Sequence, residues 1–272
     1  AVRLGTAEAI FGEGEFLEPY QDTVFALCDV CSWVMIAHAG ALPDPRWLEA
    51  GQLSAAPVPD LGACRIAAAL ALMDRALGEK LHPAIHERVR HEVDRRVFLP
   101  LEAVQPHWIF GTHNWNGVCS GATLTAALLL DPPPMRQARL ARRLTASLIH
   151  YMNTAFAGDG ASLEGIGYWQ FGLSWFVFGA KMLRTRTGGE VDLLDHPALP
   201  QVAAFPAKVE VADGIYPPFS DCDPYSRPKQ WLLDILAEET EQPDLASLAA
   251  SPDSLGREGL SFFGRCFLAP RT

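Results

Sequence analysis

The amino-acid sequence predicts a mostly α-helical domain, on two observations. Apolar residues recur at helical spacing along most of the 272 residues. Glycines and prolines separate these segments by short connections, as in successive helical hairpins. Hairpins of this kind, in a chain of this size, indicate either a helical bundle or an α/α toroid, in which loops at one end build a cleft.

Each expected helix ends at a recognisable stop signal. Gly78 follows the second, Pro100 follows the third, and Gly188 lies just beyond the sixth. Segments four and six are apolar on nearly all sides, which favours inner positions. In chain order the helices are expected at 16–39, 61–77, 83–99, 115–130, 135–156, 163–186 and 229–240.

Strand patterns appear only late, at 208–212 and 260–268. We therefore divide the chain into a helical domain, 1–258, and a possible first strand of a β-sheet domain, 259–272. Because the chain begins at Ala1 and ends after this β-like segment, we expect a processed chain or a fragment of a longer protein.

Composition limits the partners. The chain has a net charge of −10, and phosphate binding needs clustered Lys and Arg, so we expect no nucleic acid or anionic membrane surface as partner. Heavily sulfated polysaccharides are disfavoured for the same reason. The basic stretches 88–96 and 136–143 are interleaved with apolar stripes and are expected on solvated helix faces. We expect no membrane insertion, because no apolar run reaches the roughly 18–20 residues that span a bilayer.

Two segments combine amides or carboxylates with indoles and glycines at expected helix starts: 113–118 (HNWNGV) and 164–169 (EGIGYW). This combination is typical of sugar-binding clefts, where pyranose rings stack on aromatic rings and hydroxyls take hydrogen bonds. In the second segment, Glu164 and Tyr168 are i, i+4 neighbours. The Tyr168 phenol could donate or accept a proton, or it could be a core tyrosine.

In the first segment, Asn114 and Asn116 flank Trp115 at a helix start, which attracts carboxylates. An amide bonded to a substrate carboxylate would make the α-proton of the substrate easier to remove. The alternative is a helix cap with a packing tryptophan.

Other candidates are weaker. The loop 219–225 holds Asp221 and Asp223 and could line a cleft, bind calcium or be a plain turn. The histidines of 82–91 are expected on a solvated face, with metal binding as the alternative. Cys28 and Cys31 form a CxxC, read as buried helix positions, with a redox or metal role as the alternative. Nucleotide, phosphate, esterase and zincin motifs do not occur, and we expect no cofactor and no metal.

Three stretches resemble the heparinase II/III-like polysaccharide lyase family. Residues 114–122 (NWNGVCSGA) resemble its NWNxVCxGG stretch, and 164–172 (EGIGYWQFG) resemble its EGxxYWxYG stretch. Residues 214–222 (GIYPPFSDC) resemble its GxxxxFSDS element. The matches occur in the family's order, whereas residues 1–105 are similar only in helical character.

The resemblance implies an incomplete α/α toroid followed by β-sheet domains, and β-elimination at a uronic acid of an acidic glycan. It implies a periplasmic or secreted location. Members draw a further catalytic His or Tyr from the β-sheet portion, which we expect to be missing from this sequence. Carried over by motif, Asn114 neutralises the uronate carboxylate with His113 and Asn116 beside it, Tyr168 is the acid, and the sugar subsites are lined by Trp115, Glu164, Trp169 and Asp221.

Two other functions fit the same residues. A glycoside hydrolase needs two carboxyl groups about 5–10 Å apart, and Glu164 with Asp221 or Asp223 is the best pair. A non-catalytic glycan-binding domain would instead depend on Trp115 and Trp169.

Overall fold

A computed structural model describes residues 1–38, 58–212, 214–223 and 225–248. This part of the chain is mostly helical, as predicted. The β-pairing within the described residues is an isolated bridge between Ala212 and Ile215. The chain divides into two compact units. Unit 1 comprises Ala1–His107 and Ala122–Arg143, and unit 2 comprises Trp108–Gly121 and Leu144–Thr272.

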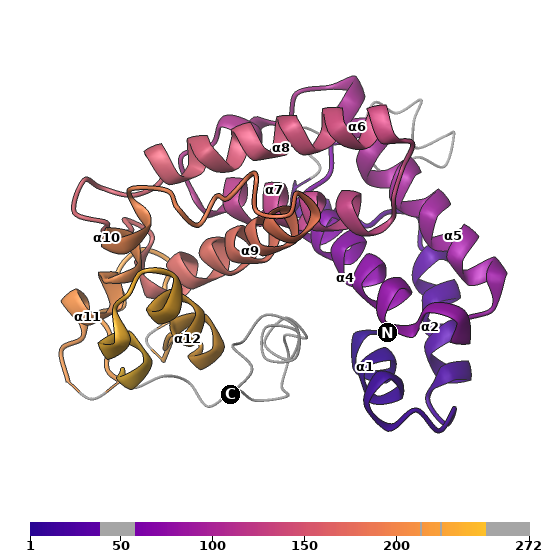
Figure 1. The fold of residues 1–272 in the computed structure, drawn as a ribbon, viewed down its shortest axis with the longest axis horizontal. Coiled ribbons are helices and arrows are strands. Elements are labelled where there is room, and N and C mark those ends of the chain that lie inside the picture. Colours follow the sequence, from indigo (N-terminus) through magenta and orange to yellow (C-terminus); the bar gives the residue numbers. More distant parts are fainter. Residues whose placement is uncertain (39–57, 213, 224, 249–272) are drawn as a thin grey trace. The chain divides into compact units, whose positions relative to one another are not determined.

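Unit 1 packs short helices from the first third of the chain (Figure 1). Helix α1 contacts both α2 and α4, and α5 contacts α2 and α4. Parts of α7 and α8 also belong to this unit. The elements from the first third are α1 (Val2–Phe11), α2 (Leu17–Asp29), η1 (Ile36–His38), α4 (Leu61–Leu77), η2 (Gly78–Lys80), α5 (Pro83–Val93), the π-helical η3 (Asp94–Phe98) and α6 (Leu99–Ala103).

Local sequence sets the bounds of α4, which agree with the predicted 61–77. The Asp60 carboxylate caps the helix start by accepting the backbone N–H of Ala63 at 2.8 Å. At the other end Gly78 takes φ +50°, a conformation that favours glycine. Ten side chains of the helix are buried, so the apolar stripe read from the sequence is a core face.

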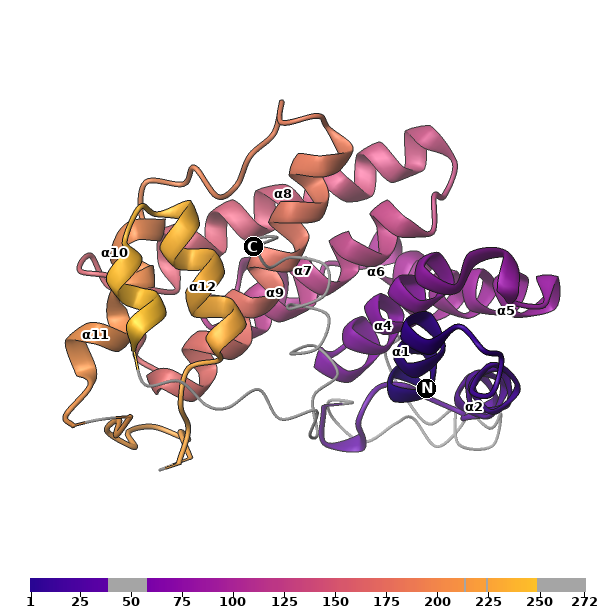
Figure 2. The same cartoon turned by 60° about the horizontal axis from the view of Figure 1, so that its bottom comes forward.

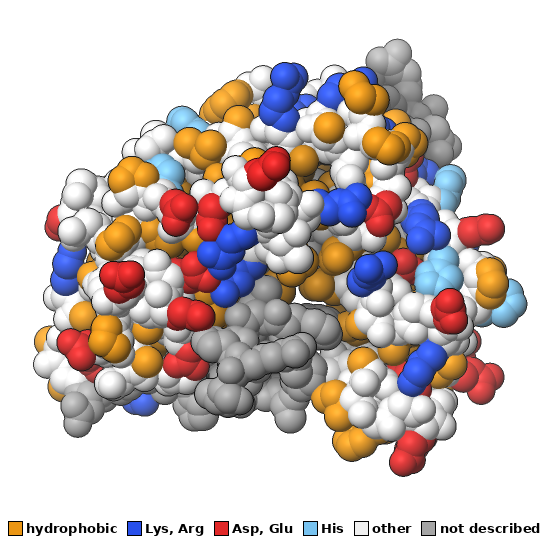
Figure 3. Space-filling model, in the orientation of Figure 1, with side chains coloured by type: hydrophobic (Ala, Val, Ile, Leu, Met, Phe, Trp, Pro, Cys, Tyr) orange, Lys and Arg blue, Asp and Glu red, His pale blue; other side chains and the backbone are white. Residues whose placement is uncertain are grey.

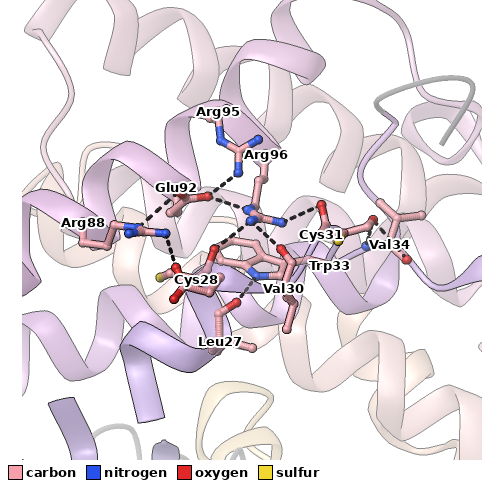
Figure 4. A network of polar contacts seen from close by, with 12 residues as sticks. Leu27, Cys28, Val30, Cys31, Trp33, Val34, Arg88, Glu92, Arg95 and Arg96 are labelled. Carbon is pink, nitrogen blue, oxygen red and sulfur yellow. Dashed lines mark hydrogen bonds and ion pairs between the residues drawn. The ribbon is translucent and has the colours of Figure 1, made fainter. Parts of the chain in front are cut away.

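Helix α2 ends ten residues before the predicted 16–39 helix does, because a distant arginine binds its terminal carbonyls (Figure 4). The Arg96 guanidinium donates to the carbonyl oxygens of Cys28 and Val30 at 2.9 and 2.8 Å. It also stacks 4.8 Å from the ring centroid of Trp33. The structure therefore corrects the expectation of a solvated basic face for Arg96, whose side chain is only 9% exposed. Arg90 and Arg95 of the same stretch are exposed, as expected.

The predicted helix 83–99 is interrupted and then continued. Helix α5 ends at Val93, a π-helical turn follows, and Pro100 lies inside the first turn of α6, where its missing N–H costs little. Proline is therefore not a stop here. Within the same unit His86 binds the buried carboxylate of Asp74 at 2.5 Å, which corrects the expectation that it faces solvent.

Unit 2 is built around α9, a helix buried on nearly all sides, as its composition predicts. Short helices α10, α11 and α12 lie together in both ribbon views (Figures 1 and 2). Its helices, with those shared with unit 1, are η4 (His107–Phe110), α7 (Asn114–Leu129), α8 (Pro134–Thr154), α9 (Gly165–Arg186), α10 (Leu199–Ala203), α11 (Phe205–Val209), α12 (Gln230–Glu239) and η5 (Pro243–Ser247).

The strand predicted at 208–212 is wrong. Residues up to Val209 complete α11, whose Phe205 is buried in the core. Of the described residues 210–212, Ala212 forms an isolated bridge with Ile215. The predicted strand 260–268 and the domain boundary at 258/259 lie outside the described residues. The toroid arrangement stays a prediction.

Charged side chains of both signs are interspersed over the face drawn in Figure 3. Arg136 from the second basic stretch binds Asp94 at 2.6 Å and Glu102 at 2.7 Å. Within the described residues, no helix is both long and apolar enough to cross a membrane.

Candidate functional site

The first and second sequence motifs meet in unit 2, at the N-terminal ends of α7 and α9. Asn114 is the first residue of α7, and Glu164 immediately precedes α9. The Glu164 carboxylate accepts the Asn114 backbone N–H at 2.7 Å and its side-chain Nδ2 at 2.6 Å. One carboxylate thus satisfies two donors at the positive end of α7.

The second polar atom of the Asn114 amide is unsatisfied. Asn114 is 4% exposed, and its Oδ1 has no hydrogen-bond partner among the described residues. Because an ionised carboxylate only accepts hydrogen bonds, Nδ2 must face Glu164 and Oδ1 must point elsewhere. The site therefore contains a buried acceptor without a donor among the described residues.

Glycines allow α7 and α9 to approach closely beside this pair. A Cβ on Gly117 would lie 2.8 Å from the carbonyl oxygen of Gly172, and one on Gly121 would overlap the carbonyl of Trp175. A Cβ on Gly172 would lie 3.2 Å from the Asn114 Cα. The glycines of both motifs are therefore needed for helix packing, whatever else they do.

A tyrosine that the sequence analysis did not select, Tyr151 of α8, fills the same crossing. Its ring is 2.8 Å from the position of a Cβ on Gly117, and its hydroxyl would overlap a Cβ on Gly172. Burial, with the charge of Glu164 as a second cause, raises the pKa of Tyr151 far above its ordinary value. The phenol thus stays protonated. Tyr151 could not be selected from the sequence, because an aromatic residue on an apolar helix face looks the same as a core residue.

The third motif packs against the start of α9. Gly165, at φ +78°, would place a Cβ 2.9 Å from that of Cys222. The backbone N–H of Gly167 donates to the Cys222 sulfur at 3.2 Å. Asp221 and Asp223 on this loop are exposed, and the Asp223 carboxylate accepts the backbone N–H of Tyr225 at 2.7 Å. The three motifs are thus contiguous in space.

Tyr168, Trp115 and His113 are partly exposed near these helix starts. Tyr168 lies one turn into α9 beyond Glu164, and among the described residues its hydroxyl has no hydrogen-bond partner. The His113 ring lies against Gly111, and its carbonyl accepts the Asn116 backbone N–H at 3.1 Å.

Two of the selected side chains are enclosed by protein. Asn116 is fully buried, and its Oδ1 accepts a hydrogen bond from Ser147 at 2.9 Å. Trp169 is 1% exposed, and its indole N–H donates to the Val202 carbonyl at 2.9 Å. Both side chains therefore lie in the packed interior, and their contacts with a sugar stay a prediction.

No model of a known protein family matches this chain, and no curated protein matches it significantly. Within the described part of the chain, no three His, Cys, Asp or Glu side chains gather closely enough to hold a metal ion.

Proposed function

We propose that this chain is the helical part of a polysaccharide lyase that cleaves a uronate-containing glycan by β-elimination. The observation that carries the proposal is the Asn114–Glu164 pair, because it places a buried amide and a helix N-terminus at a point where a carboxylate binds. Withdrawing charge from a uronate carboxylate there makes the neighbouring C5 proton more acidic.

The proton transfer to the leaving group is assigned to the tyrosine nearest this point along the chain. Tyr168 follows Glu164 by one helical turn, is partly exposed, and has a hydroxyl without a described partner. A base removes the C5 proton, the C4–O4 bond breaks, and the Tyr168 phenol donates a proton to the departing O4. The products are a fragment with a new reducing end, which leaves with O4, and a fragment that begins with a uronate carrying a C4–C5 double bond.

The double bond supplies the test. We expect ultraviolet absorbance to rise when the chain is mixed with a uronate polymer, screened over an unsulfated panel. Tyr168→Phe should lower the rate by about 10²- to 10⁴-fold, the usual contribution of a positioned acid. Tyr225→Phe is the matched control, because Tyr225 is 87% exposed, and should leave the rate unchanged. A Tyr168→Phe variant as fast as the parent would exclude this tyrosine as the acid.

A glycoside hydrolase is the second candidate, favoured by one observation: the loop that carries Asp221 packs on Gly165, directly beside Glu164. Hydrolysis releases reducing ends without ultraviolet absorbance. Under this function Asp221→Asn abolishes release, whereas a lyase depends mainly on Tyr168. If no polymer is cleaved and Tyr168→Phe leaves glycan binding unchanged, the domain only binds glycans.

A further inference from the structure

Phe110 is an exposed aromatic residue close to the candidate site in unit 2. It is 57% exposed, whereas the preceding Ile109 is buried. Asn114 follows four residues later, so the two Cα atoms are at most about 14 Å apart. A short oligosaccharide bound at Asn114 can therefore reach the Phe110 ring.

The backbone on both sides of Phe110 is held by side-chain hydrogen bonds to three successive carbonyl groups. The Asn116 amide donates one N–H to the Ile109 carbonyl at 3.3 Å and the other to the Gly111 carbonyl at 3.1 Å. The His150 Nε2 donates to the Phe110 carbonyl between them at 3.0 Å. Water could satisfy carbonyls at a protein surface, so these bonds do more than satisfy acceptors. They fix the direction in which the backbone presents Phe110.

The Asn116 amide is in turn oriented by the interior of unit 2. The hydroxyls of Ser120 and Ser147 bond to its Oδ1 at 3.1 and 2.9 Å, and all three side chains are buried. A buried polar network that is satisfied in this way is rigid. It connects the first sequence motif to the backbone of the exposed Phe110.

The ring of Phe110 is held as well. It packs against the His150 imidazole with centroids 5.6 Å apart and ring planes at 88°, the edge-to-face geometry. In this geometry His150 leaves at least one face of the phenyl ring uncovered. An aromatic ring that is already ordered loses little conformational entropy when a ligand stacks on it. The apolar face of a pyranose ring suits such a surface.

We propose that Phe110 is the stacking platform of a second sugar subsite, next to the one at Asn114, and that His150 positions its ring. This inference rests on the proposed function for the class of ligand, a uronate glycan. Phe110 lies outside the three sequence motifs, so the subsite adds a contact that none of them contains.

The test is equilibrium binding to the full chain in the Tyr168→Phe background, which suppresses cleavage. Calorimetry first selects the tightest ligand from unsulfated hexasaccharides of glucuronate, mannuronate, guluronate and galacturonate. We expect Phe110→Ala to weaken binding of this hexasaccharide about tenfold, as for the loss of an aromatic anchor. Phe110→Tyr keeps the ring and should bind like the parent.

NMR of the bound hexasaccharide reports on stacking itself, because sugar protons over an aromatic face shift upfield. The shift should persist in Phe110→Tyr and vanish in Phe110→Leu, which carries the test if Phe110→Ala fails to fold by circular dichroism. His150→Ala should weaken binding in the parent but cause no further loss in Phe110→Ala, because His150 acts through the ring.

Phe11→Ala is the matched control. Phe11 is 65% exposed on unit 1 and also packs against another ring, that of Phe16, at 6.2 Å. Its loss should leave hexasaccharide binding unchanged.

Three results would overturn the subsite. If Phe110→Ala binds the hexasaccharide as tightly as the parent, the subsite fails while the proposed function stands. An equal loss of affinity in Phe11→Ala would show that the effect is not specific to Phe110. If the parent binds none of the four hexasaccharides, the subsite and the proposed function fail together.

Discussion

Glu92 and Glu164 both accept N–H groups at their carboxylates, but their partners differ in charge. Glu92 is 4% exposed and is bound by Arg95 and Arg96, each at 2.6 Å, with Arg88 at 3.2 Å (Figure 4). Among the described residues, the hydrogen bonds to the Glu164 carboxylate come from neutral amides of Asn114. Removing one partner of the first arrangement should be the more costly change, because it leaves an uncompensated buried charge.

Stability should depend on the charge of Glu92. Burial alone would raise the pKa of Glu92, but the hydrogen bonds from Arg96 and Arg95 outweigh it and lower the pKa below its ordinary value. The ion pairs therefore stabilise the fold above the unfolded pKa, and this contribution is lost as pH falls through the folded pKa. We expect Glu92→Gln to lower the free energy of unfolding at about pH 7 and to have a smaller effect at about pH 3.

Urea unfolding at both pH values measures this difference. Glu87→Gln is the control, because Glu87 is exposed on the same helix. An equal loss of stability at both pH values would show that Glu92 acts through packing rather than charge.

Sequence reasoning could select the polar residues of the candidate site but not their partners. It placed Asn114 and Glu164 at helix starts, where the structure has them, yet their contact joins residues 50 positions apart. The burial of Trp169 could not be predicted, because aromatic rings serve both in binding sites and in cores. Tyr151 was missed for the same reason.

Helix bounds followed from sequence where the signals were local. Asp60 and Gly78 define both ends of α4, and the prediction for this helix was correct. The early end of α2 could not be predicted, because Arg96 lies 68 residues from the carbonyl of Cys28 that it binds. The strand expected at 208–212 was wrong for a related reason: a pattern of five residues is too short to separate strand from helix when a buried Phe205 begins a helical turn.

The glycines at the crossing of α7 and α9 should be sensitive to a single methyl group. Gly121→Ala places a Cβ against the carbonyl of Trp175, a backbone atom that cannot rotate away. We expect a loss of about 2 kcal/mol in the free energy of unfolding, since overpacking of a core typically costs about 1–3 kcal/mol. This loss should appear even though alanine favours a helix over glycine by about 1 kcal/mol.

Urea unfolding of Gly121→Ala against Gly158→Ala measures the effect. A Cβ on Gly158 meets nothing within 4 Å, so this control should stay close to the parent. If both variants have the same midpoint, the two helices are less tightly packed at this point than the structure indicates.

At the scale of the whole molecule, the net charge of −10 opposes the approach of an acidic glycan. Screening should relieve this repulsion, because the Debye length falls from about 30 Å at 0.01 M salt to about 8 Å at 0.15 M. We expect the association rate with a uronate polymer to rise over this range of sodium chloride. The association rate is measured by flowing the protein over surface-immobilised polymer at a series of sodium chloride concentrations.

A fall in the association rate with salt would contradict this expectation and would indicate a local cationic face that attracts the polymer before contact. A neutral polymer of the same length is the control, since its association rate should not depend on salt in this range.

The glycine crossing also fixes the register between two helices. A slip of α9 by one residue along α7 would bring Phe171 or Leu173 to the place of Gly172, against the hydroxyl of Tyr151. Neither side chain fits there, so α9 cannot slide in single-residue steps. The distance between Asn114 and the start of α9 is therefore set by the glycines of the crossing, several residues away. Any motion that opens the site must then come from side-chain rotation or from the loop before α9.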